Sequence, residues 1–200
     1  MYDFVCITNR SLCKDDYFER IKRIAFSKPS AIILREKDLS ENEYILLAQK
    51  VIEICENNSR LILHNYVNAA VKLNFKSIHL PMHVLKQLNE GQRGYFTILG
   101  ASCHSVKDAV EAQSLGCTYI TASNIYETDC KKGLKGKGLA FLSEVCEAVS
   151  IPVYALGGIT PENYHDVIKA GAKGACVMSG IMTVDNPNKY IIKFGAKNEI

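Results

Sequence analysis

The chain has 200 residues, of which 48% are hydrophobic and 22% are charged, as in an ordinary globular protein. This length is enough for one hydrophobic core and leaves no room for a second, so we expect a single domain over residues 1–200. The net charge of +3, from 24 basic and 21 acidic residues, is too small to indicate nucleic acid as a partner.

Short apolar strands alternate with amphipathic helices along the whole chain. The strands are expected at residues 4–7, 31–34, 61–63, 77–80, 96–100, 119–122, 153–156 and 175–178. The helices between and after them are expected at residues 14–27, 41–55, 67–74, 84–89, 106–115, 139–149 and 160–170, with a last one after residue 185.

Capping residues support three of these helix starts. Ser40 with Glu43 three residues later has the spacing of a capping box, and Ser105 is placed to cap the helix that follows it. Thr160 before Pro161 is the pattern of an N-cap followed by a first-turn proline.

Eight strands, each followed by a helix, predict an α/β fold of the (β/α)8 TIM-barrel type. The alternative is an open doubly wound sheet, which usually has a glycine-rich turn after its first strand. Here that turn is Thr8-Asn9-Arg10, and the glycine-rich turns come late in the chain. The order of the turns therefore favours the closed barrel.

Two glycine-containing corners follow the last two predicted strands. They contain Gly157 and Gly158 after one strand and Ser179 and Gly180 after the next. Backbone N–H groups at such turns and at a helix N-terminus can hold a phosphate. We therefore expect these four residues to bind the phosphate of a small metabolite.

Charged residues follow other strands at the same end of the predicted barrel. Arg35, Glu36 and Lys37 come directly after the second strand, where Arg35 and Lys37 would suit an anionic substrate and Glu36 could pair between them. A solvated loop is the alternative interpretation. The polar loop 127–138, rich in lysine and glycine, suits either a lid over an anion or a flexible connector.

The histidines leave their roles open when taken one at a time. His104, before a helix cap, could transfer protons or simply bond a neighbouring carbonyl group. His79 lies in an apolar strand, where we expect it in the core. No group of histidines and carboxylates has the spacing of metal ligands, so no metal site is expected.

Several segments in a fixed order make the chain resemble the thiamin phosphate synthase/TenI superfamily over nearly its whole length. They are Ile7-Thr8, Leu34 to Lys37, Cys103-His104-Ser105, Tyr126 to Gly133, Leu156 to Pro161 and Val177 to Ile181. The resemblance implies a TIM barrel that binds a thiazole phosphate. One arm of the superfamily couples this compound to hydroxymethylpyrimidine diphosphate with magnesium, and the TenI arm includes thiazole tautomerases.

The departures from the synthase pattern favour the TenI arm. The two magnesium-binding aspartates that the resemblance implies are replaced by Asn65 and Val84. Neutral side chains are poor substitutes for carboxylates around a hard cation, and diphosphate departure needs that cation. A second departure is from the TenI pattern itself. The histidine that TenI tautomerases use after the sixth strand corresponds to Asn124, whose amide cannot take up a proton, so another group would have to transfer it.

The leading hypothesis is a thiazole tautomerase of thiamin biosynthesis, an isomerase, without a cofactor. Its catalytic candidates are Glu36 or His104 as the proton carrier, and Asn124 at the position of the family's histidine. The candidates for binding the substrate and its phosphate are Arg35, Lys37, Asn65, Lys132, Gly157, Gly158, Ser179 and Gly180. Two alternatives remain: a divergent thiamin phosphate synthase, a transferase that would need Mg²⁺, and a non-catalytic binding or regulatory protein.

The sequence shows no signal peptide and no apolar run near the ~20 residues that cross a bilayer. The eight cysteines form no C-x-x-C pair, as expected for reduced thiols. We therefore expect a cytoplasmic protein with no membrane partner. Extra apolar residues on helix faces would suit a homodimer, and would equally suit packing against the barrel.

Overall fold

Eight parallel strands close into a barrel in the order of the sequence, with the last strand paired to the first. The computed structural model describes residues 3–56, 58–128, 133 and 135–195. The predicted (β/α)8 fold is therefore confirmed, and the open doubly wound sheet is wrong. The strands are β1 (Asp3–Ile7), β2 (Ala31–Leu34), β3 (Leu61–His64), β4 (Ser77–Pro81), β5 (Ile98–Cys103), β6 (Tyr119–Ser123), β7 (Val153–Leu156) and β8 (Gly174–Val177).

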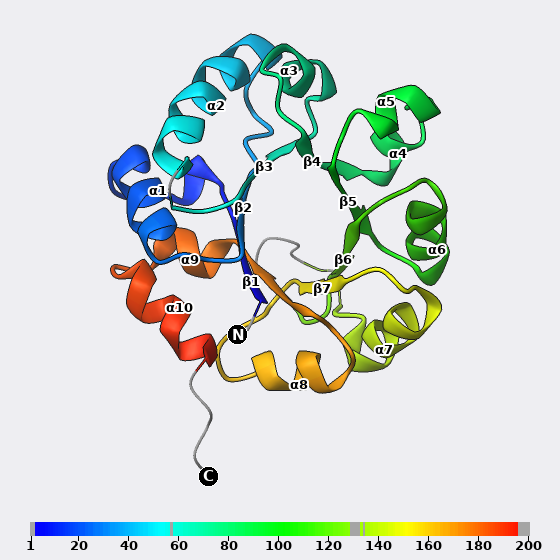
Figure 1. Cartoon of the computed structure of the whole chain (residues 1–200). Coiled ribbons are helices and arrows are strands. Elements are labelled where there is room, and N and C mark those ends of the chain that lie inside the picture. Colours follow the sequence, from blue (N-terminus) through cyan, green and yellow to red (C-terminus); the bar gives the residue numbers. More distant parts are fainter. Residues whose placement is uncertain (1–2, 57, 129–132, 134, 196–200) are drawn as a thin grey trace.

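Helices surround the strands as an outer ring (Figure 1). A short 3₁₀ helix, η1 (Arg10–Leu12), follows β1. The α-helices are α1 (Tyr17–Phe26), α2 (Glu41–Cys55), α3 (Val67–Lys72), α4 (Met82–Leu85), α5 (Glu90–Gly94), α6 (Val106–Ser114), α7 (Gly138–Ala148), α8 (Tyr164–Lys169), α9 (Ser179–Thr183) and α10 (Pro187–Gly195).

The strands are apolar at successive positions because both of their faces are buried. On β2, Ile32 and Leu34 pack into the outer core beneath the helices, whereas Ile33 packs into the separate cluster inside the barrel. Successive strand side chains point to opposite faces, so one short strand serves both cores. This alternation also decides which residues after each strand face the barrel mouth.

Two predicted helix starts are confirmed by their hydrogen bonds. The Ser40 side chain accepts from the Glu43 backbone N–H, and the Glu43 carboxylate accepts from the Ser40 N–H at 2.8 Å, which completes the capping box. The Ser105 hydroxyl accepts from the Asp108 N–H at 3.0 Å. Both caps satisfy N–H groups that a helix start leaves without a partner.

The predicted helix start at Thr160 is wrong. Helix α8 begins at Tyr164, and the intervening residues form a turn held by Asn163. The Asn163 side chain accepts from the Thr160 N–H and donates to the Gly158 carbonyl oxygen, both at 2.9 Å. An asparagine side chain that bonds nearby backbone groups competes with helix formation. The turn thereby braces the glycine corner after β7.

Further boundaries differ from the prediction: α1 begins at Tyr17, α3 ends at Lys72, and the short helix α9 was not predicted. The helix expected at residues 84–89 is α4, which covers Met82–Leu85, and a further helix that was not predicted, α5, begins after Asn89, where Asn89 and Gln92 form a second capping box. The fifth strand runs over Ile98–Cys103 rather than 96–100, since Thr97 and Ile98 both donate to the Lys76 carbonyl oxygen at its start.

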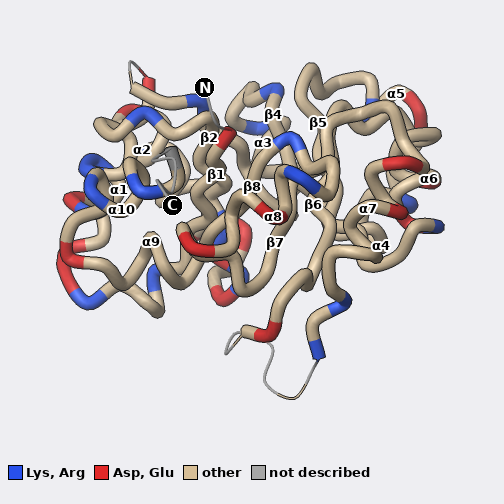
Figure 2. Tube along the Cα trace, turned by 90° about the horizontal axis from the view of Figure 1, so that it is seen from below, with Lys and Arg blue, Asp and Glu red and all other residues tan. Residues whose placement is uncertain are grey.

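Charged residues of both signs lie mainly on the surrounding helices and loops, as Figure 2 shows. No helix among the described residues combines the length and the apolar composition that crossing a membrane requires. The described cysteines are free thiols.

Candidate functional site

A cavity of about 670 Å³ opens at the carboxyl ends of the strands. Loops and strand ends from around the whole barrel contribute to its lining, as is usual for sites on this fold. Its polar and charged side chains include Arg35, Lys37, His64, His79, His83, Ser102, His104, Ser123, Asn124 and Thr128. The cavity therefore combines cations, imidazoles and neutral hydrogen-bonding groups.

The two predicted glycine corners meet on one side of this cavity. Gly157, Gly158, Ser179 and Gly180 all line it. Gly157 and Gly158 have positive φ angles of 102° and 66°, and a Cβ at Gly158 would lie 2.5 Å from the Glu127 carbonyl oxygen. This corner needs glycine both for its backbone conformation and for its close contact with the neighbouring loop.

Arg35 and Lys37 both line the cavity, as predicted for side chains that bind an anion. Arg35 crosses toward β8, where its Nη1 lies 3.7 Å from the Met178 sulfur. Among the described residues, no Asp or Glu lines this cavity. The electrostatic character of the described lining is therefore cationic.

The described residues of the cavity do not suit the Mg²⁺ ion that the resemblance implies for the synthase arm. In the described part of the chain, no group of three or more His, Cys, Asp or Glu side chains is placed to hold a metal ion. Val84 and Asn65, at the positions of the family's aspartates, do not line the cavity. Mg²⁺ prefers carboxylate oxygens, which the described lining does not supply.

Glu36 lies outside the cavity, unlike the two cations beside it in the sequence. Its carboxylate is buried, with 1% of the residue exposed, and accepts from the Thr8 hydroxyl at 2.6 Å, the Tyr17 hydroxyl at 2.9 Å and the Arg10 N–H at 2.9 Å. These bonds tie the loop after β1 and helix α1 to the end of β2. Its position supports a structural role rather than the predicted proton transfer.

Two other predicted binding residues are not part of the described cavity. Asn65 does not line it, and its backbone N–H donates to the His79 carbonyl oxygen at 3.1 Å. Lys132 lies outside the described residues, so its predicted position over the ligand stays a prediction.

His104 follows β5 and Asn124 follows β6, and both residues line the cavity. The Nδ1 atom of His104 lies 3.1 Å from the Ser123 carbonyl oxygen and 3.1 Å from the Ser123 hydroxyl oxygen, so Ser123 engages this nitrogen in either tautomer of the ring. The peptide bond between Ser123 and Asn124 is cis. The imidazole of His104 is thus held beside the residue that replaces the family's histidine.

Sequence reasoning missed part of the polar lining. His79, expected in the core, lies in the barrel interior and lines the cavity with His64 and Ser102. The His64 and His79 rings stack with centroids 6.0 Å apart. Burial lowers the pKa of His79 to about 3 and that of His64 well below its usual range. The signal that could have found them is their alternation with outward-facing apolar residues.

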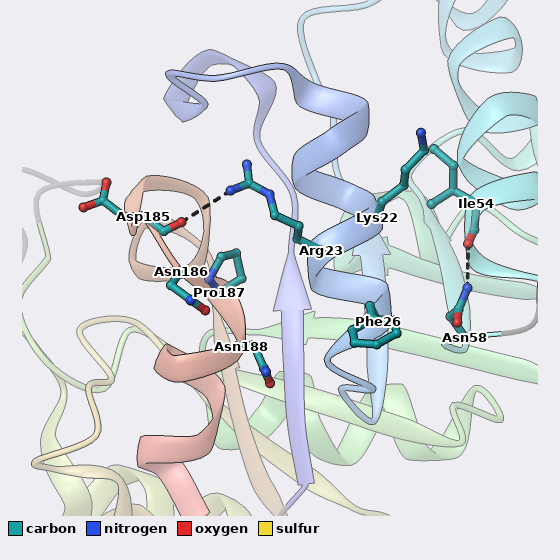
Figure 3. A pocket seen from close by; sticks show the side chains of 9 residues that line it. All are labelled: Lys22, Arg23, Phe26, Ile54, Asn58, Asp185, Asn186, Pro187 and Asn188. Carbon is teal, nitrogen blue, oxygen red and sulfur yellow. Dashed lines mark hydrogen bonds between the residues drawn. The ribbon is translucent and has the colours of Figure 1, made fainter.

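A second hollow of about 510 Å³ lies on the outer surface between α1, α2 and α10 (Figure 3). Its Lys22 is paired with Glu19 at 2.5 Å, and its Arg23 donates to the Asp185 carbonyl oxygen at 3.4 Å. This hollow lies on the outside of the ring of helices, and its two cations are already engaged by Glu19 and by the Asp185 carbonyl oxygen. The barrel mouth is the better candidate site on both counts.

The chain matches a family model described as thiamine monophosphate synthase over residues 4–181. A thiamine-phosphate synthase from Clostridium botulinum (strain Kyoto) is 32% identical over 202 residues, covering 98% of this chain and 96% of the relative. One from Clostridium acetobutylicum is 30% identical over 185 residues, covering 91% and 88%.

The fold is also that of a solved thiamine phosphate pyrophosphorylase from Pyrococcus furiosus. The TM-score is 0.83 at 24% identity, covering 97% of this chain and 94% of that chain. The names of these relatives favour the coupling transferase, which was the alternative activity, over the tautomerase. From the family match and the two bacterial relatives, the chain belongs to the thiamine monophosphate synthase/TenI family.

Proposed function

We propose that this protein acts in thiamin biosynthesis, binds a phosphorylated thiazole at the barrel mouth and shifts a proton on it. The observation that carries the proposal is the composition of the cavity: two cations, four imidazoles and a glycine-rich corner, without a carboxylate among the described lining residues. Such a cavity suits an organic phosphate and a reaction that needs no metal ion.

The phosphate is assigned to the corner between β7 and α9. Gly157, Gly158 and Gly180 line this side of the cavity, where we expect their backbone N–H groups to donate to the phosphate, and Arg35 reaches toward it. A dianionic phosphate bound there would be stabilised by these donors and by the guanidinium charge.

Ser179→Asp tests this assignment. A carboxylate at the first position of α9 favours the helix but repels a phosphate, so we expect thiazole phosphate binding to weaken at least about tenfold while the melting temperature stays the same. Ser179→Asn is the matched control of similar size without the charge. Equal affinity in the two variants, measured by calorimetry, would place the phosphate elsewhere.

His104 is the proposed proton carrier. Ser123 engages its Nδ1 through the carbonyl oxygen and the hydroxyl, so Nε2 is the nitrogen left for the substrate, and the tautomer with hydrogen on Nδ1 leaves Nε2 free to take a proton. Lys137 donates to the His104 carbonyl oxygen and helps to hold this segment. In the proposed step, Nε2 takes a proton from one carbon of the non-aromatic tautomer. It then returns the proton to another carbon as the ring becomes aromatic, so no atom is lost.

The test is turnover of the carboxythiazole phosphate tautomer, followed by ultraviolet absorbance. We expect His104→Gln to slow the proton shift by about 10²–10⁴-fold, with little change in affinity for the aromatic product. His165→Gln, on α8 and outside the cavity, is the control. Binding without acceleration in the unmodified protein would instead support the non-catalytic binding protein.

A second candidate function is thiamine phosphate synthesis, favoured by the names of the relatives. It requires diphosphate to leave, a step that depends on a divalent cation in the family pattern, and the described lining lacks the carboxylates to hold one. Mixing both substrates with Mg²⁺ and measuring thiamin phosphate separates the candidates. Formation of thiamin phosphate would overturn the proton-shift proposal as the main activity.

A further inference from the structure

Four interior residues lie at one level across β3 to β6. The strand register pairs His64 with His79, His79 with Gly100, and Gly100 with Tyr119. A Cβ at Gly100 would lie 2.2–2.5 Å from the Tyr119 ring and hydroxyl. The ring of Tyr119 therefore lies over the glycine, and the missing side chain lets it reach a histidine two strands away.

Two hydrogen bonds continue this arrangement into the cavity. The Tyr119 hydroxyl lies 2.9 Å from His79 Nδ1, and His79 Nε2 lies 2.8 Å from Ser102 Oγ. Tyr119 and His79 are buried, with 8% and 3% of each residue exposed, whereas Ser102 is half-buried and lines the cavity. The three side chains thus form a chain from the barrel interior to the ligand site.

Burial decides which way this chain of hydrogen bonds runs. A neutral imidazole has one N–H and one accepting nitrogen. If Nδ1 carried the hydrogen, the Tyr119 hydroxyl would accept, and its own buried hydrogen would have no acceptor among the described residues. An unsatisfied buried donor is costly, so Tyr119 donates to Nδ1 and the Nε2–H donates to Ser102.

The hydrogen of the Ser102 hydroxyl is then directed to the cavity. Thr121 is the register partner of Ser102, but its buried hydroxyl has no hydrogen-bond partner in the described structure and does not accept from Ser102. We infer that Tyr119 and His79 are positioning residues that make Ser102 a hydrogen-bond donor, so the site selects a ligand with an acceptor atom at that point.

This inference deepens the proposed function and rests on it for the choice of ligand. Ser102 comes from β5, whereas the phosphate corner follows β7 and β8. The acceptor that Ser102 would meet therefore belongs to the ring end of the ligand, as a ring nitrogen or a carboxylate oxygen. A ring carrying only N–H or O–H donors at this point would leave the Ser102 hydrogen without an acceptor and bind more weakly.

The direction of the hydrogen bonds can be measured in the free protein. With ¹⁵N-labelled histidine, long-range ¹H–¹⁵N spectra distinguish the protonated ring nitrogen from the bare one. We expect His79 to be neutral, with hydrogen on Nε2 and a bare Nδ1. Hydrogen on Nδ1 would overturn the inference, whatever the protein binds.

Tyr119→Phe removes the donor that orients His79, and Tyr154→Phe is the matched control. Tyr154 packs edge-on against Tyr119 with ring centroids 5.9 Å apart but makes no hydrogen bond to His79 in the described structure. We expect Tyr119→Phe to reduce the fraction of Nε2–H tautomer and to weaken binding of methylthiazole ethyl phosphate about tenfold. Inorganic phosphate should bind both variants equally.

Equal binding of the thiazole phosphate by the two variants would also overturn the inference. If the unmodified protein does not bind this probe, the proposed function fails, whereas the histidine spectrum still decides the direction of the hydrogen bonds. The two failures are therefore distinguishable.

Discussion

The interior of the barrel has two unlike walls. The apolar wall, from β8, β1 and β2, presents Cys176, Val5, Ile7 and Ile33. The polar wall, from β3 to β6, presents His64, His79, Ser102, Tyr119, Thr121 and Ser123. Apart from the half-buried Ser102, the side chains of both walls are buried, so the difference does not follow from exposure to water.

The comparison separates what holds the barrel together from what serves a ligand. Burial of the apolar wall needs no hydrogen-bond partners and stabilises the fold by about 25 cal/mol per Å² of apolar surface removed from water. Burial of the polar wall is favourable only where each group has a partner. His79 uses both ring nitrogens, whereas the Thr121 hydroxyl has no partner in the described structure. Because the polar wall is harder to stabilise, we attribute its polar side chains to the binding of a ligand in the cavity that they face.

The largest expected effect is on the apolar wall. Ile33→Ala would leave a cavity at a residue that is 1% exposed and lower the free energy of unfolding by about 2–5 kcal/mol. Ser102→Ala on the polar wall should cost less than about 1 kcal/mol, because its partner, His79 Nε2, then faces the cavity and its water. Urea unfolding measures both. Similar losses of unfolding free energy in the two variants would show that the two walls contribute equally to the stability of the fold.

The next effect is the dependence of stability on pH. Burial holds the pKa of His79 at about 3, below its unfolded value of about 6.5. The unfolded chain therefore binds a proton that the folded protein does not, and stability falls as the pH drops below about 6.5. Between pH 7 and pH 5 we expect a loss of about 2 kcal/mol from His79.

His79→Gln should remove that part of the loss. Urea unfolding of both proteins at the two pH values measures it. His64, whose pKa burial also lowers, adds to the slope of both proteins in the same direction and does not obscure the difference. An unchanged slope in the variant would show that His79 is accessible to protons in the folded protein.

The smallest effect has the opposite sign. Thr121→Val replaces a fully buried hydroxyl that has no partner in the described structure with a methyl group of similar size. We expect the free energy of unfolding to rise by about 1 kcal/mol, measured by urea unfolding. A loss of that size would instead show that the hydroxyl bonds a buried water molecule and belongs to the functional part of the polar wall.

The closed barrel could be predicted from the sequence because its signals are local. Apolar runs of four residues, a helix after each and late glycine turns do not depend on distant contacts. The start of α8 could not be predicted in the same way. Thr160 and Pro161 form a good local helix signal, but the Asn163 side chain bonds the backbone of Gly158 and Thr160 instead.

The candidate site also has a part that local sequence signals predict and a part that they do not. Arg35, Lys37 and the glycine corners were predictable because they follow strands, and strand ends meet at the barrel mouth. Glu36 has the same signal but points the other way, into bonds with Thr8 and Tyr17. Alternation along the chain then separates neighbours whose chemistry alone looks equally suited to a site.

What the sequence by itself determined is the number and order of strands, the place of the two glycine corners after the last strands and the residues that replace the family's aspartates and histidine. The tertiary structure alone decided which charges face the cavity and that Tyr119 reaches His79 across Gly100. The physical reason is that composition and periodicity report only on interactions between residues close together in the chain. Contacts across the barrel depend on strand register, which exists only once the sheet has closed.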